Sequence, residues 1–383
     1  MLIDTTDGLN ALCERLKKHS FITVDTEFIR EKTYFPQLCL VQIASPEEAV
    51  CIDPLAKDLD MSSLYALMTD ENVVKVYHAA RQDIEIFYNM TGKIPEPLFD
   101  TQVAAMVCGF KESVGYQHLV SKLLKVNLDK TMRFTDWSRR PLTDKQVEYA
   151  LNDVTYLRDV YLKLKTMLET RGRTDWVAEE MAVLRDPHTY CQDPMEMWKR
   201  FKPTGRSPAY LGLLRALAAW REEEARRCNR PRKHILRDEM VLDIAATAPE
   251  SVEEMEKMRS LSKGFAKGRL GKAVLGIVQK AKKDRVELVV ASDERDEIPA
   301  SAQALIKMLR VLLSVKSAQH GVAEKMIASC EEIDLLGSRD APDIPALKGW
   351  RYDVFGKDAM ALKHGRLAMK YNAAKKCMET FAV

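Results

Sequence analysis

Two acidic residues lie close together in an otherwise apolar, strand-like segment, residues 21–28. Side chains alternate between the two faces of a strand, so Asp25 and Glu27 share one face while the even-numbered residues occupy the other. Half-buried like charges repel each other, and burial costs several kcal/mol per ion unless a partner compensates the charge. The pair therefore predicts either a salt bridge to Arg30 or Lys32 or a site for metal cations.

Two further acids and a tyrosine occupy positions on predicted helices. Asp83 lies in the first turn of a helix that follows an apolar strand, where a carboxylate also has the purely structural role of stabilising the helix N-terminus. Tyr149 and Asp153 are one helical turn apart, beside the apolar stripe of a long helix, where a cleft can open next to the sheet. Four carboxylates without His or Cys ligands favour the hard cations Mg²⁺ or Mn²⁺.

The elements that must position these residues divide the chain into two halves. The first half alternates strands and helices, which is typical of an α/β fold, and a short turn containing Pro46 predicts a hairpin and hence a mixed sheet. Strands are predicted near 21–27, 38–44, 49–52 and 73–77, and helices near 61–69, 81–91, 101–108, 115–126 and 144–170. Beyond a linker at 201–208 the apolar spacing predicts almost only helices, and a second break at 292–299 divides them into two modules.

Composition and charge narrow the classes of function. No apolar run approaches the roughly 18 uncharged residues of a membrane helix, and the first residues lack a secretory signal, so we expect a cytoplasmic protein without a membrane partner. The eight cysteines form no C-x-x-C pair, which indicates neither zinc nor disulfides. Residues 257–285 contain ten Lys or Arg and one acid, while the rest of the chain has 49 basic and 55 acidic residues. This basic run predicts a polyanionic partner, with a solvated helix face as the alternative.

Taken in order, the motifs resemble those of the DEDD-type 3′→5′ exonucleases, in the variant that has Tyr in the third motif. Asp25-x-Glu27, Asp83 and Tyr149-x-x-x-Asp153 match its three motifs. Similarity to bacterial ribonuclease D is carried by the flanking segments at residues 25–30, 33–36, 99–102, 115–119 and 136–142. The helical half is similar as well, because residues 208–285 resemble an HRDC module and 349–356 resemble the tail of ribonuclease D, where a second, divergent HRDC copy is found.

This resemblance implies a fold and a division into domains. We expect a ribonuclease H-like, mixed-sheet exonuclease domain at residues 1–203, followed by two all-α domains of HRDC type, at 208–288 and, in divergent form, at 296–383.

The resemblance also implies a mechanism with two divalent metal ions, Mg²⁺ or Mn²⁺. Asp25 would bridge the two ions, Glu27 and Asp153 would hold the ion that activates water, and Asp83 would help to place the other. An unperturbed phenol has a pKa of about 10, so Tyr149 is expected to orient the metal-bound hydroxide rather than to act as the base.

The implied reaction is hydrolysis of single-stranded RNA 3′ ends to 5′-mononucleotides by a monomer, with transfer-RNA precursors as the expected substrate. Eight residues are predicted to contact the substrate: Thr26, His78, Arg226, Arg230, Arg232, Lys263, Lys267 and Arg269. Two alternatives remain open at this point. The same acids serve DNA exonucleases of the proofreading or repair type, and a non-catalytic nucleic-acid-binding protein could retain the fold.

Overall fold

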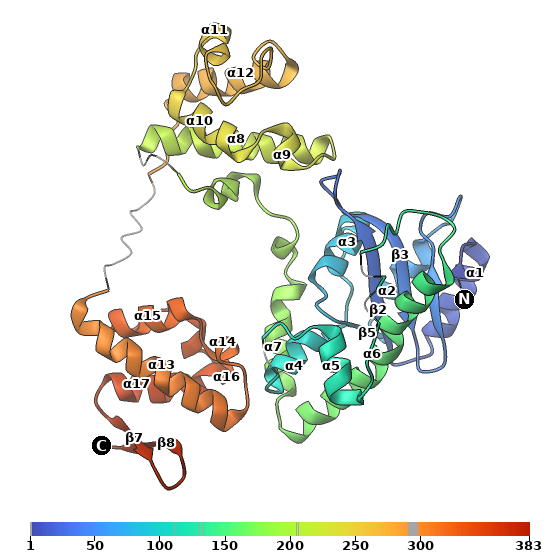
Figure 1. Cartoon of the computed structure of the whole chain (residues 1–383), viewed down its shortest axis with the longest axis vertical. Helices are drawn as coiled ribbons and strands as arrows, with labels where there is room; N and C mark the ends of the chain where they lie inside the picture. Colours follow the sequence, from blue (N-terminus) through green and yellow to red (C-terminus); the bar gives the residue numbers. More distant parts are fainter. Residues whose placement is uncertain are drawn as a thin grey trace.

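In the computed structural model of the chain, the described residues are 2–110, 112–129, 131–132, 134–203, 205, 207–289 and 298–383. An α/β body forms the N-terminal part, and two helical bodies follow it (Figure 1). None of the described helices is long and apolar enough to cross a membrane.

The N-terminal body is built on the predicted mixed sheet. Its strand order is β1-β4-β3-β2-β5-β6, in which β2, β3 and β4 are antiparallel neighbours while β5 and β6 run parallel to β2. The Ser45 amide donates to the Glu48 carbonyl at 2.9 Å and closes the predicted hairpin between β3 and β4. The strands are β1 (Leu2–Ile3), β2 (Phe21–Ile29), β3 (Gln37–Ala44), β4 (Ala49–Ile52), β5 (Val74–Tyr77) and β6 (Leu98–Asp100).

Helices pack on both faces of this sheet. The longest, α6, begins at a capping box in which the Thr143 side chain and Gln146 satisfy each other's backbone amides. Its apolar stripe packs on β2, β3 and β4. The helices are α1 (Thr6–Leu16), α2 (Ser62–Met68), α3 (Arg81–Thr91), α4 (Thr101–Val107), α5 (Tyr116–Leu124), α6 (Asp144–Thr170) and α7 (Thr174–Arg185).

The two faces of β2 have different surroundings, as the alternation predicted. Thr23 points towards α6, because its hydroxyl donates to the Val154 carbonyl at 2.8 Å. Asp25 and Glu27 share this face, whereas Val24 packs in the apolar core with α1, α2 and α3. A β-bulge follows Glu27, where the pairing of β2 with β3 shifts. The extra residue, Cys39, belongs to β3, so the irregularity interrupts the regular pairing of the two strands beside the second carboxylate.

The second body is helical and has its own core. After the 3₁₀ segments η1 (Pro187–Thr189) and η2 (Pro194–Arg200), it comprises α8 (Pro208–Arg227), α9 (Arg232–Ile235), α10 (Asp238–Thr247), α11 (Val252–Glu256) and α12 (Arg269–Lys283). Met197 and Phe201, which lie within the range predicted for the first domain, pack in this core.

The third body departs from the helical prediction at its end. It contains α13 (Ala300–His320), α14 (Glu324–Ile327), α15 (Cys330–Ser338), η3 (Pro345–Leu347), α16 (Gly349–Arg351), η4 (Tyr352–Gly356) and α17 (Lys357–Lys363). An antiparallel hairpin of β7 (Leu367–Asn372) and β8 (Cys377–Ala382) then closes the chain. Most of the predicted break at 292–299 lies outside the described residues.

Candidate active site

The acidic residues of β2 lie beyond the point where its parallel neighbour ends. The pairing of β2 with β5 stops at Thr23 and Val76, so the strand carries Asp25 and Glu27 past the end of β5. There the chain turns away into α3, and Ala79 adopts a left-handed conformation with φ of 60°. This divergence of the two chains leaves room beside Asp25.

Asp100 holds that turn in place. Its carboxylate accepts hydrogen bonds from the amides of Ala79 and Ala80 at 3.1 and 2.8 Å. The same side chain caps α4 through the Gln102 and Val103 amides. One buried acid thus fixes the loop after β5 and, through it, the first turn of α3 that carries Asp83.

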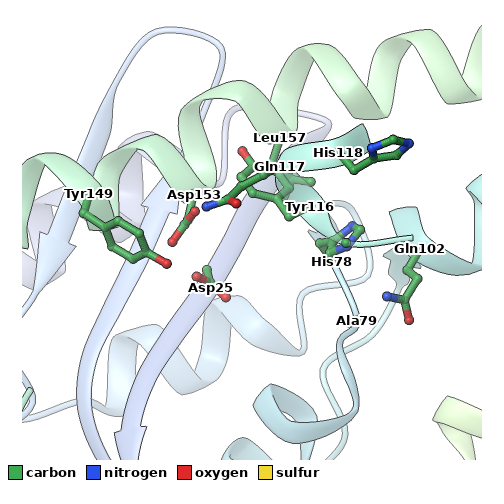
Figure 2. Close-up of a pocket in the computed structure, with 11 residues that line it drawn as sticks. Asp25, His78, Ala79, Gln102, Tyr116, Gln117, His118, Tyr149, Asp153 and Leu157 are labelled. Carbon is green, nitrogen blue, oxygen red and sulfur yellow. The ribbon is translucent and has the colours of Figure 1, made fainter. Parts of the chain in front are cut away.

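Three of the predicted metal ligands converge in space. Asp25, Glu27 and Asp153 each offer a carboxylate oxygen, and these oxygens lie within 4.8 Å of one another. Figure 2 shows Asp153 and Tyr149 projecting from α6 towards Asp25 on β2. The Tyr149 hydroxyl hydrogen-bonds the Asp153 carboxylate. Asp25, Tyr149 and Asp153 line a pocket of about 440 Å³.

Asp83 lies outside this group of three. It is buried on α3, and its carboxylate accepts a hydrogen bond from the Thr26 hydroxyl. Burial raises the pKa of Asp83 well above its ordinary value, and the nearby charge of Asp25 raises it further. This electrostatic coupling links the fourth acid to the cluster.

The acids of the cluster strongly disfavour one another's ionisation. Burial, together with the charges of Asp25, Asp153 and Asp83, raises the pKa of Glu27 to about 10. Burial and the charge of Asp25 raise the pKa of Asp153 to about 8, although its hydrogen bond from Tyr149 opposes that shift. Four carboxyl groups in this space need added positive charge to ionise together, which is the property expected of a divalent-cation site.

The structure does not support the salt-bridge alternative for the strand acids. Arg30 pairs with Glu85 at 2.9 Å instead. Within the described part of the chain, Lys32 forms no ion pair and is exposed. Neither predicted cation neutralises Asp25 or Glu27, so this set of carboxylate donors fits an oxygen-loving divalent cation.

Comparison with known proteins agrees with this geometry. The 3′–5′ exonuclease family model matches residues 1–169, and the HRDC domain model matches residues 211–278. The ribonuclease D of Granulibacter bethesdensis is 49% identical over 369 residues, which cover 96% of this chain and 93% of that protein. The chain belongs to the ribonuclease D family.

Another family member and a solved structure extend the likeness over nearly the whole chain. The ribonuclease D of Acidiphilium cryptum is 48% identical and covers 96% of this chain and 94% of its own length. The crystal structure of Escherichia coli RNase D is 30% identical, covers 95% of this chain and 98% of its own, and has a TM-score of 0.80. The predicted fold class is confirmed as a ribonuclease H-like, mixed-sheet exonuclease body followed by a helical HRDC body. The HRDC match lies at residues 211–278, and the third body, which ends in the hairpin of β7 and β8, departs from the predicted all-α domain.

Two predicted substrate contacts have internal partners in this ribonuclease D family member. Thr26 is buried and its hydroxyl donates to Asp83, so it helps to hold one of the predicted metal ligands in place. His78 lines the pocket, but its Nδ1 lies 3.0 Å from the Thr101 hydroxyl and its Nε2 lies 3.0 Å from the Val114 carbonyl. Both ring nitrogens are therefore engaged within the protein.

The predicted basic contacts fall into two groups. Arg226 and Arg232 lie at the junction of α8 and α9 with the loop between β2 and β3, where both contact Tyr34. Lys267 and Arg269 are exposed and paired with Glu256 and Glu224. Arg230 and Lys263 are also exposed, and no ion pair is formed by either within the described residues.

The sequence prediction missed several residues that line the catalytic pocket, namely Gln102, Tyr116, Gln117 and His118. All four lie in segments that carried the resemblance to ribonuclease D. The sequence therefore marked these segments as similar to the family but did not assign these residues to the pocket. Gln42 was missed as well. It is fully buried opposite Asp25 in the pairing of β2 with β3, and no hydrogen-bond partner for its amide is found among the described residues.

Proposed function

We propose that this chain is a metal-dependent 3′→5′ exoribonuclease that removes 5′-mononucleotides from single-stranded RNA 3′ ends. One observation carries the proposal most directly. Asp25, Glu27 and Asp153 bring carboxylate oxygens within 4.8 Å of one another at a pocket, in a chain of the ribonuclease D family.

The pocket residues divide the work of phosphodiester hydrolysis. Asp25, Glu27, Asp83 and Asp153 would hold two divalent ions, Mg²⁺ or Mn²⁺, which when bound supply an activated water and stabilise the leaving oxygen. Asp153 anchors the Tyr149 hydroxyl, which is thereby placed to orient the attacking water. Asp100 and Thr26 hold the loop and the acid that complete the site.

The helical bodies would provide affinity for RNA. In this proposal Arg230, Lys263, Lys267 and Arg269 contact phosphates from exposed positions of the HRDC domain, at 208–288, and a further domain follows at 296–383. Lysine and arginine contacts to phosphates give binding that weakens steeply with salt.

The physiological substrate in this proposal is a transfer-RNA precursor, processed in the cytoplasm by a monomer. The Escherichia coli relative is described as an exoribonuclease involved in structured RNA processing, which supports this class of substrate. A structured RNA with a single-stranded 3′ end offers unstacked bases to the pocket and a folded region to the helical bodies.

A labelled-substrate assay tests the reaction and its polarity together. With 5′-labelled RNA and Mg²⁺ or Mn²⁺, we expect a ladder of progressively shorter labelled products and released 5′-mononucleotides. EDTA should abolish both. Asp25→Asn should remove activity, since it deletes a ligand charge at the centre of the cluster.

The same assay decides between the proposal and its alternatives. Equal or faster degradation of a matched DNA oligonucleotide would favour a DNA exonuclease. Activity that survives Asp25→Asn, or the absence of mononucleotide release by the wild-type chain, would overturn the catalytic assignment.

A further inference from the structure

A second pocket lies at the junction of the α/β body, the following segment and the HRDC body. Its volume is about 540 Å³. Four arginines line it, Arg30 and Arg81 from the α/β body, Arg200 from η2 and Arg232 from α9. Glu85 is the one acid among its lining residues, so the lining carries a net charge of +3. We call it the arginine pocket.

Two of these arginines are held in fixed positions. The Arg30 guanidinium donates to Glu85 at 3.1 Å and to the Tyr34 carbonyl at 3.0 Å. Arg232 pairs with the buried Glu222 and donates to the Tyr34 hydroxyl at 3.2 Å. Arg30 and Arg232 are therefore each paired with a carboxylate, and the excess positive charge of the pocket lies on Arg81 and Arg200.

The other two arginines lack such partners. Within the residues that the structure describes, neither Arg81 nor Arg200 forms an ion pair with a carboxylate. Both residues are exposed, and Arg200 donates a hydrogen bond to the neutral amide oxygen of Gln192 at 3.4 Å. Guanidinium groups gathered around a pocket without counter-charges form a site for an anion with several oxygens, such as a phosphate.

The aromatic side chains of the pocket are already engaged. Arg226 and Arg232 lie over the Tyr34 ring, at 5.8 and 4.9 Å from its centroid. Tyr190 packs against Tyr88, and its hydroxyl donates to the Leu184 carbonyl at 2.7 Å. The pocket therefore presents guanidinium groups rather than open ring faces, which suits a phosphate better than a base.

The start of α3 connects the arginine pocket with the catalytic pocket along the chain. Ala79 lines the catalytic pocket, while Arg81 and Gln82 line the arginine pocket. Consecutive Cα atoms are about 3.8 Å apart, so one short turn separates a site that attracts cations from a site that attracts anions. In the proposal developed here, an RNA strand with one phosphodiester at the carboxylates passes this turn, so that a neighbouring phosphate meets the arginines.

We propose that the arginine pocket binds a backbone phosphate of the RNA strand upstream of the bond that is cleaved. This proposal rests on the proposed function, because it assigns the pocket to the same substrate. It adds Arg30, Arg81 and Arg200 to the proposed substrate-binding residues. Arg232, which the sequence already predicted to contact the substrate, becomes part of the same phosphate-binding pocket.

Kinetics with substrates of two lengths test the proposal. A dinucleotide has a single phosphodiester, which must lie at the carboxylates to be cleaved, so it has no phosphate for the arginine pocket. For Arg200→Gln in the full chain, we expect kcat/KM on a long single-stranded RNA to fall about tenfold, as for one lost charge-assisted hydrogen bond. The dinucleotide should be cleaved at the wild-type rate. The log–log salt slope of long-RNA binding should become shallower by about 0.7.

Matched variants separate the pocket from general charge effects. Arg185→Gln removes an exposed arginine at the end of α7, outside the arginine pocket, and should leave the long-RNA kinetics and salt slope unchanged. Arg200→Lys keeps the positive charge but loses the planar guanidinium group that can donate two parallel hydrogen bonds. Compared with Arg200→Gln, it should restore most of the salt slope of RNA binding and part of kcat/KM on long RNA.

Three outcomes would overturn the proposal. Wild-type kinetics and salt slope on long RNA for Arg200→Gln would show that no phosphate binds there. An equal loss on the dinucleotide would show that Arg200 acts through the catalytic pocket. Inhibition of dinucleotide cleavage by adenosine 5′-monophosphate that depends on Arg200 would assign the pocket to a free nucleotide. In each case mononucleotide release by the wild-type chain keeps the proposed function intact, whereas its absence would refute that function separately.

Discussion

Glu27 lies among three other carboxyl groups, and burial together with their charge raises its pKa to about 10, from an ordinary 4.5. Burial raises the pKa of Asp25 and Asp153 as well. Without metal, these carboxyl groups therefore bind more protons in the folded chain than in the unfolded chain between pH 4.5 and about 10. Their contribution to the free energy of unfolding falls as the pH rises through that interval.

Thermal unfolding in EDTA checks this relation. We expect the Tm of the metal-free protein to be a few degrees higher at pH 5 than at pH 9. Mg²⁺ or Mn²⁺ should raise the Tm more at pH 9, because metal ligands must be deprotonated. Glu27→Gln is the control, since it removes the most strongly shifted group and should flatten the difference. The prediction would be contradicted if the Tm of the wild-type protein rose from pH 5 to pH 9 by as much as the Tm of Glu27→Gln does.

Tyr149 provides a second prediction at the residue scale. Tyr149→Phe removes the hydroxyl bound to Asp153 without changing the carboxylates. We expect kcat to fall roughly a hundredfold, as for loss of a group that positions a reactant. The metal concentration for half-maximal activity should change little. Tyr161→Phe, on the same helix but packed against Phe21, should behave like wild type. An unchanged kcat would remove Tyr149 from the reaction.

The sequence predicted that Asp25, Glu27 and Asp153 lie near one another, and the fold brings them together beside Tyr149; the roles of the five motif residues remain proposals. Their neighbours could not be assigned in the same way. Thr26 stands between Asp25 and Glu27, and His78 lies five residues before Asp83, yet their hydrogen bonds go to partners that only the fold brings near. Gln42 was missed because its position opposite Asp25 depends on the register of β2 and β3.

At the scale of elements, the site depends on how the loop after β5 is held. The carboxylate of Asp100 accepts hydrogen bonds from backbone amides on both sides, those of the turn before α3 and those of the first turn of α4. Asp100 is 3% exposed, so its loss would leave buried amides without partners. The position of Asp83 depends on this turn.

Replacement of Asp100 by Ala should therefore affect both stability and catalysis. We expect Asp100→Ala to lower the free energy of unfolding by about 2 kcal/mol and to reduce kcat/KM, because α3 loses the fixed start of its first turn. Thr5→Ala removes a cap from α1, where the Thr5 side chain accepts from Gly8, and should cost about 1 kcal/mol without a change in kcat/KM. Denaturant unfolding and steady-state kinetics measure both effects. Equal kcat/KM for the two variants would show that the turn does not position the site.

The long, strongly patterned elements were predicted closely, and the short or atypical ones were missed. Helix α6 begins and ends where the sequence predicted. Strands β1 and β6 have two and three residues, too few to show alternation. The hairpin of β7 and β8 is half exposed, and the helix-favouring Ala and Met of β7 give no strand signal, so local propensity misled the prediction there.

At the scale of the whole molecule, the α/β body contacts each helical body through its own junction. The Asn229 side chain accepts from the Tyr34 and Phe35 amides at 3.1 and 3.0 Å, beside the pairing of Glu222 with Arg232. These partners are nearly 200 positions apart, so no local pattern indicates them. The domain limits at 1–203, 208–288 and 296–383 consequently remain proposals, although the HRDC match lies within the second of them.

The junction with the third body is more apolar. Trp350 stacks on Trp176 of α7, with ring centroids 4.5 Å apart and an angle of 12° between the planes. Its indole nitrogen donates to Glu180 at 3.1 Å, and Arg351 donates to the same carboxylate at 2.6 Å. Trp350 is 5% exposed, so it connects the third body to the α/β body as a core residue would.

Removal of this indole should loosen the molecule without changing the chemistry of the catalytic pocket. We expect Trp350→Ala to cost about 3–5 kcal/mol in stability and to increase the radius of gyration measured by X-ray scattering. Cleavage of a dinucleotide should keep the wild-type kcat, since every ligand carboxylate belongs to the α/β body. Tyr352→Ala, an aromatic side chain that is 44% exposed on the same segment, should change neither quantity. An unchanged radius of gyration for Trp350→Ala would show that the remaining contacts hold the third body in place. A fall in the kcat for the dinucleotide would show that this junction supports the active site itself.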